Sequence, residues 1–250
     1  HSFEALTPEI DSIANSMLSY ERPKRWYDTK ELLRLYMMLV ALKHTGVPYR
    51  KLTFYIGQEL VEASIAAGQP LAGYVNKRIS RALKRLLGDV EFGVWFHIEP
   101  TPEKSVKRPP YHAHGILFID DQSWFIRDSS KRKKLGRAFL KATGQDDTMC
   151  PQNWQEMKKQ DLTFGWIDYS RQSRRNRMFI MDFEICPEEI GDPLSAMSHS
   201  MARRAKSFYE RMLPLIRAIV GNKYLEFSFD DWRKLNEGYP DPLAFLSAAE

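Results

Sequence analysis

The sequence predicts an α+β fold in which a central antiparallel sheet carries a His-x-His strand and is covered by helices. Two apolar runs rich in aromatic and β-branched residues, 92–99 and 112–119, read as neighbouring strands joined by a proline-rich linker. Helical periodicity flanks this pair over residues 71–87 and 129–143. Helices beside a strand hairpin, rather than strict alternation of strand and helix, are typical of α+β proteins.

Composition narrows the function classes. The 250 residues are 43% hydrophobic and 12% aromatic, which indicates one large globular domain or two small ones. No apolar run is long enough for a membrane span and no signal peptide is visible, so we expect no membrane partner and a cytoplasmic location. The two cysteines lack CxxC spacing, which argues against a thiolate zinc site. The net charge of +5 favours anionic partners.

The first elements follow from capping and periodicity. A helix is expected over residues 28–45, with Asp28 as its N-cap and Glu31 three residues later as in a capping box. Gly46 and the following Val-Pro end it. Residues 52–56 are short, apolar and bounded by glycine, and they predict a strand.

Basic residues gather on the two helices that flank the hairpin. The helix over 71–87 buries one apolar face, and its other face has charges of a single sign, which favours either a bound anion or simple solvation. The helix over 129–143 is the second basic segment. As candidate DNA-phosphate contacts we take Lys77, Arg78, Arg81, Lys84, Arg85, Lys131, Arg132, Lys133 and Lys134.

Further strands are expected at 162–166 and 178–185, and a last long helix at 193–220. The predicted organisation is an N-terminal helical segment over 1–49, a central domain over 50–185, and a C-terminal helical extension over 186–250. The sequence leaves the oligomeric state open.

His112 and His114 are the most specific feature of the chain. Side chains alternate along a strand, so these two imidazoles share one face. On the preceding strand His97 and Glu99 also share a face, and hairpin pairing would bring Glu99 to the same ion. One carboxylate and two imidazoles with open positions suit Mg²⁺ or Mn²⁺ acting on phosphate. Two ordinary core or surface histidines are the alternative.

Phosphodiester cleavage at such a site needs a nucleophile, either water or a tyrosine. Tyr169 is the first candidate because it follows an apolar run and precedes an arginine cluster, of which Arg171, Arg174 and Arg175 are candidate DNA contacts. Tyr209, on the last predicted helix, is the second candidate. Each tyrosine has an ordinary alternative, as a strand-end aromatic or an amphipathic-helix residue.

The run from Arg81 to Glu99, followed by Tyr111-His-Ala-His-Gly115, resembles HUH endonucleases, which include the rolling-circle replication initiators of bacterial plasmids and phages. The resemblance implies an HUH/RRM-like palm with metal ligands Glu99, His112 and His114. It implies that Tyr169 nicks single-stranded DNA, at an origin or hairpin, through a 5′-phosphotyrosine intermediate.

The chain departs from that family at Gln172, three residues after Tyr169, where many members have lysine. Arg171 or Arg174 replaces the lysine, or another tyrosine is the nucleophile, or nicking is impaired. Two alternative functions therefore remain: a non-catalytic HUH-fold DNA-binding protein, and a metal-dependent phosphodiesterase that uses activated water.

Overall fold

The computed structural model describes residues 25–29, 31–100, 111–145, 166, 190–191 and 193–220. The chain divides into two units, one formed by Thr45–Arg203 and the other by His1–His44 together with Arg204–Glu250. Across the described helices, none has both the length and the apolar character required to cross a bilayer.

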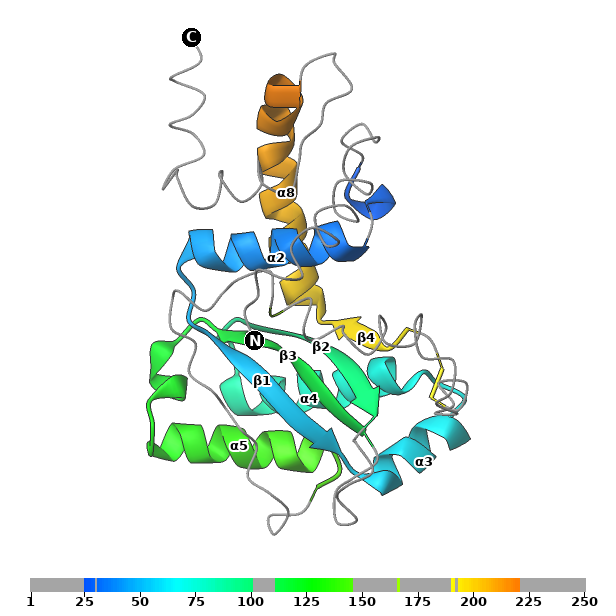
Figure 1. The fold of residues 1–250 in the computed structure, drawn as a ribbon. Coiled ribbons are helices and arrows are strands. Elements are labelled where there is room, and N and C mark those ends of the chain that lie inside the picture. The colour runs from blue at the N-terminus through cyan, green and yellow to red at the C-terminus, as the bar shows by residue number, and fades with distance from the viewer. Residues whose placement is uncertain are drawn as a thin grey trace, which may run out of the picture. The chain divides into compact units, whose positions relative to one another are not determined.

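The larger unit is built on an antiparallel sheet of four strands in the order β1-β3-β2-β4. The strands are β1 (Tyr49–Ile56), β2 (Phe92–Pro100), β3 (Tyr111–Ile119) and β4 (Ser195–Met197). β3 is hydrogen-bonded to β1 on one side and to β2 on the other (Figure 1). The predicted α+β class, with an antiparallel sheet that carries His112 and His114, is confirmed.

Helices α4 (Leu71–Leu87) and α5 (Ser130–Ala142) cover one face of this sheet, as Figure 1 shows, and α3 (Gln58–Ala66) precedes them. The apolar positions of α4 recur at helical spacing and are fully buried against alternate residues of the strands. This core includes Val75, Ile79, Leu83, Leu135, Phe139, Phe54, Phe96, Ala113 and Leu117. It fixes which strand face points away from the helices.

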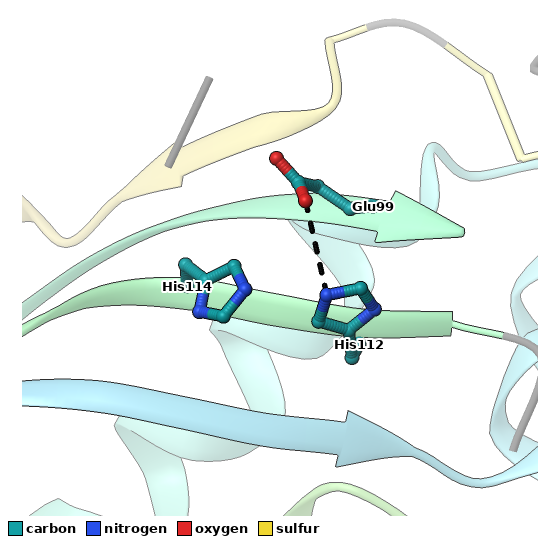
Figure 2. A group of neighbouring side chains, drawn as sticks. All are labelled: Glu99, His112 and His114. Atoms are coloured by element: carbon teal, nitrogen blue, oxygen red, sulfur yellow. Dashed lines mark ion pairs between the residues drawn. The ribbon is translucent and has the colours of Figure 1, made fainter. Parts of the chain in front are cut away.

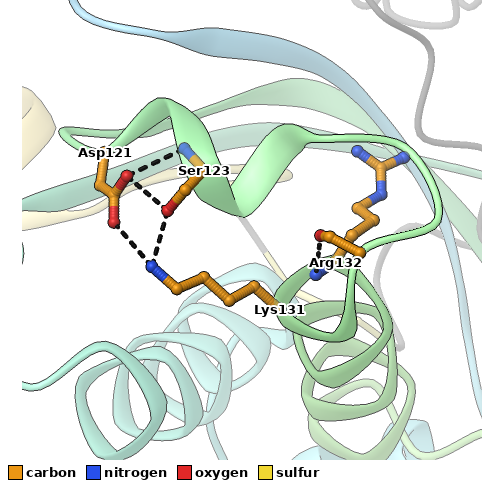
Figure 3. A network of polar contacts seen from close by, with 5 residues as sticks. Asp121, Ser123, Lys131 and Arg132 are labelled. Atoms are coloured by element: carbon orange, nitrogen blue, oxygen red, sulfur yellow. Dashed lines mark hydrogen bonds and ion pairs between the residues drawn. The ribbon is translucent and has the colours of Figure 1, made fainter.

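A polar network ties the turn after β3 to the start of α5 (Figure 3). Asp121 caps the short helix η3 (Gln122–Phe125), and its carboxylate accepts from Ser123 N and Oγ at 2.9 and 2.6 Å. These bonds lower the pKa of Asp121. Lys131 Nζ lies 3.2 Å from the same carboxylate. Ser129 caps α5 by accepting from Arg132 N at 3.1 Å.

The smaller unit contains η2 (Trp26–Asp28), α2 (Glu31–Thr45) and most of α8 (His199–Val220). Aromatic side chains pack between these elements. The Trp26 and Tyr209 ring centroids are 5.7 Å apart, and those of His44 and Phe208 are 5.3 Å apart.

Several predicted boundaries are wrong. The first helix begins at Glu31 rather than residue 28, because Asp28 ends the 3-10 turn η2. The strand expected at 52–56 begins at Tyr49. The last helix begins at His199 rather than residue 193, because Ser195–Met197 pair with β2 as the unpredicted strand β4. Helix α3 is a further element absent from the sequence prediction.

The strand predicted at 178–185 lies outside the described residues. Of the strand predicted at 162–166 only Trp166 is described, and its backbone is helical. The prediction is therefore wrong at that residue.

Gly115 allows β3 to lie close to β2. A Cβ atom built on Gly115 would stand 2.0 Å from Trp95 O and 2.8 Å from Phe96 Cα. Both atoms belong to the backbone of β2, so they cannot rotate away as a side chain would. Any larger residue must push the two strands apart directly beside the His-x-His segment.

Replacing Gly115 with alanine is expected to lower the free energy of unfolding by about 1–3 kcal/mol, because the added methyl overpacks a strand pair that has no room for it. Chemical denaturation measures the change. The control is Gly73→Ala in α4, where a Cβ meets nothing within 4 Å. Since glycine is unfavourable in a helix interior, the free energy of unfolding of this control is expected to rise by about 0.5–1 kcal/mol. Equal effects at the two glycines would contradict the packing argument.

Candidate metal centre

Strand register places the three predicted ligands together. In the β2–β3 pair Glu99 lies opposite His112, and His97 lies opposite His114. In the β1–β3 pair Tyr55 lies opposite His112, and Thr53 lies opposite His114. The ligands therefore stand in two adjacent cross-strand rows, where directly opposed Cβ atoms are about 5 Å apart.

These side chains lie on the sheet face that α4 and α5 do not cover. Ala113, between the two histidines, belongs to the core beneath the sheet. Because successive strand residues point to opposite faces, His112 and His114 point away from that core. Glu99 follows the core residue Ile98 and shares their face.

The ligand atoms converge. One nitrogen of each histidine and one oxygen of Glu99 all lie within 4.8 Å of one another. His112 Nε2 is 3.7 Å from Glu99 Oε2, and these side chains are only 14% and 15% exposed. Figure 2 marks this ion pair with a dashed line. The two imidazole rings meet edge to face at 4.9 Å. A carboxylate and two imidazoles so placed can hold one divalent cation and leave positions open for a substrate oxygen.

His114 is held in the neutral form that a metal ligand requires. Burial, and secondarily the neighbouring His112, lowers the pKa of His114 to about 4. Its Nδ1 is 3.0 Å from Thr53 Oγ1. A hydrogen bond to the second ring nitrogen orients a metal-binding histidine and fixes its tautomer.

Trp166 and Lys51 border the cluster. The Trp166 ring lies 5.6 Å from that of His114, and its Nε1 donates to Gly115 O at 3.0 Å. Lys51 Nζ stands 4.8 Å from the centre of the same indole ring. The edge of the site thus combines an aromatic surface with a cation.

Other predicted site residues lie elsewhere. His97 shares the sheet face but is buried, with Nδ1 2.7 Å from Ser195 Oγ in β4. Tyr209 is 1% exposed and packs on Trp26, which argues against its role as a nucleophile. The remaining candidates Tyr169, Arg171, Arg174 and Arg175 lie outside the described residues.

The predicted DNA contacts of α4 and α5 are not beside the cluster. Both helices pack on the opposite face of the sheet, so their basic side chains lie on the far side of that helical layer. Lys131 is engaged with Asp121 and Ser123, and Lys84 lies 3.4 Å from Asp89.

Thr53 and Lys51 are site residues that the sequence analysis missed. Alternation along the first strand was available as a signal for Thr53, because its two neighbours are apolar and mark the other face. Lys51 lies beside the charged Arg50, so the apolar pattern does not mark it. Their relation to His114 follows only from the register of β1 against β3.

Comparison with known proteins does not assign a family. A scan against family models gives no match, and searches of curated proteins and of solved structures give none either.

Mn²⁺ is expected to raise the melting temperature of the protein. An ion that binds only the folded state adds about 2.7 kcal/mol to the free energy of unfolding when its concentration is one hundred times its Kd. Glu99→Gln and His112→Ala should abolish this shift. Thr53→Val should weaken Mn²⁺ binding about 10–100-fold by freeing the His114 ring. The exposed His199→Gln serves as control in calorimetric titrations. An unchanged affinity in Glu99→Gln would rule out the three-ligand site.

Acid should destabilise the metal-free protein through His114. The unfolded chain takes up a proton near pH 6.5, whereas folded His114 takes it up only near pH 4. Its contribution to stability is thus complete above pH 6.5 and is lost as the pH falls from 6.5 to 4. The free energy of unfolding of wild type and of His114→Gln is measured at each pH. The difference between the two isolates the contribution of His114, because the other acid-sensitive groups are present in both proteins. Parallel pH profiles for the two proteins would contradict the assignment.

Proposed function

We propose that this chain is a metal-dependent endonuclease of the HUH type that nicks single-stranded DNA and keeps the 5′ end on a tyrosine. The observation that carries the proposal is the convergence of Glu99, His112 and His114 within 4.8 Å on adjacent antiparallel strands. This convergence supports the proposal because one carboxylate and two imidazoles at this spacing can share one divalent cation.

The donor set fits Mn²⁺ or Mg²⁺, and its two imidazoles favour Mn²⁺ of the pair. Such an ion would polarise the scissile phosphate and stabilise charge on its oxygens. The protein's part is to hold the three ligands on a rigid sheet, with His114 neutral at physiological pH. Lys51, whose Nζ lies 4.8 Å from the centre of the Trp166 ring, would contact a neighbouring phosphate of the DNA strand.

Tyr169 remains the proposed nucleophile. Trp166, which packs on His114, precedes it by three residues. Three extended residues span at most roughly 11 Å, so the covalent chain allows the tyrosine to reach the cluster. In the proposed step the tyrosine oxygen loses its proton and bonds to phosphorus. The bond from phosphorus to the 3′ oxygen breaks, and that oxygen takes up a proton in place of the one that the tyrosine released. The product is a free 3′-OH that can prime rolling-circle replication.

A nicking assay tests this function. The protein is incubated with Mn²⁺ and a labelled single-stranded hairpin oligonucleotide library, and SDS-resistant adducts are counted. Wild type should form an adduct, whereas Tyr169→Phe and His112→Ala should reduce it at least about 100-fold. Tyr209→Phe is the matched control and should retain adduct formation.

Each other outcome selects an alternative. Cleavage without an adduct would indicate a phosphodiesterase that uses water. Salt-sensitive binding without cleavage would indicate a DNA-binding protein without nicking activity. An adduct that persists in Tyr169→Phe would refute the choice of nucleophile.

A further inference from the structure

Helices α4 and α5 concentrate positive charge, of which only Lys84 and Lys131 have a carboxylate partner among the described residues, Asp89 and Asp121. α4 carries five lysine and arginine side chains and α5 carries six, and neither sequence contains an aspartate or glutamate. The whole chain has a net charge of only +5, so the remainder of the sequence is net acidic. Like charges on adjacent helical turns repel one another and destabilise the free helix. A bound polyanion would relieve this repulsion.

Four of these cations line a groove of about 380 Å³ between the two helices: Arg78, Arg81, Arg85 and Lys141. Ala82, Ala138 and Ala142 complete its lining. Arg78 Nε also donates to Ala142 O at 3.3 Å, which joins α4 to the last turn of α5. Among the described residues, no carboxylate lies within 4.0 Å of any of the four cationic groups.

The geometry points to this groove as a second DNA site that binds the phosphate backbone of duplex DNA, on the opposite face of the sheet from the metal cluster. Arg78, Arg81 and Arg85 follow one another along a single helix and span about 10 Å at 1.5 Å per residue. Such a row can follow a duplex backbone, which carries one charge per 1.7 Å of helix axis.

The lining favours a duplex over a single strand. Proteins that bind single strands combine a basic groove with aromatic side chains for stacking, and the groove lining contains only arginine, lysine and alanine. Arginine clusters also recognise acidic or phosphorylated peptides. The choice of duplex DNA therefore rests on the extended row of arginines along α4, and polyglutamate is the competing ligand in the test. The inference rests on the proposed function only in taking DNA as the polyanion.

The test measures duplex binding by the full chain at several salt concentrations in EDTA, with a 20-base-pair duplex of arbitrary sequence. Arg81→Gln/Arg85→Gln/Lys141→Gln should reduce the slope of log K against log salt by about 2.7, since each DNA phosphate that the protein neutralises adds about 0.9 to the slope. Between 50 and 200 mM salt, the affinity of wild type should then fall about 40-fold more than that of the variant.

The matched control is Arg127→Gln/Arg137→Gln/Arg203→Gln, which removes three positive charges from exposed residues of the same unit that lie outside the groove. Its slope should change by less than about 1. If the triple variant folds poorly, the single variant Arg85→Gln tests the same prediction, because its slope of log K against log salt should fall by about 0.9.

An equal decrease of slope in both triple variants would overturn the groove assignment, as would an unchanged slope in the groove variant. An equal effect on single-stranded DNA, or equal affinity for polyglutamate, would overturn the choice of duplex. Because the assay contains no metal and scores no cleavage, its result is independent of whether the nicking proposal stands.

Discussion

The candidate site depends on the antiparallel register of β2 against β3. That register sets Glu99 opposite His112, and Gly115 permits the close strand approach that keeps their polar atoms near one another. A slip by one residue would turn both histidines into the core and turn Ala113 outward. The core beneath the sheet opposes such a slip, because Leu117 and Ile119 would lose their packing in that core as well. The core thus specifies the geometry of the polar face above it.

Partial burial keeps His114 neutral and oriented within the cluster. His114 is 9% exposed, which raises the cost of its charged form and keeps the imidazole neutral at physiological pH. Thr53 then orients the ring through Nδ1. The same residues on a fully solvated strand would remain rotationally free and would be partly protonated near pH 6.5. The fold therefore supplies preorganisation that the sequence motif alone does not.

Local signals predicted both ends of α4. The 3.6-residue apolar period and the C-cap Gly88 are properties of the helix and its immediate neighbour, so they can be found without knowledge of the fold. The alternation in β2 and β3 likewise predicted the shared face of Glu99, His112 and His114. Non-local features were missed. β4 has three residues and is defined only by its pairing with Trp95–His97. Thr53 joins the site through a register that no local pattern encodes. For the same reason, the sequence did not reveal that the basic helices lie behind the sheet.

Placing the basic helices behind the sheet resolves an electrostatic conflict. A site that attracts a divalent cation is weakened by nearby positive charge, whereas holding a polyanion requires such charge. The outward faces of α4 and α5 are separated from the cluster by the sheet and by a helix about 10 Å across. Exposed charges interact weakly beyond the Debye length of about 8 Å at physiological salt. The eleven cations of the two helices therefore do not oppose a metal ion at Glu99, His112 and His114, and the proposed duplex site is compatible with the candidate metal centre.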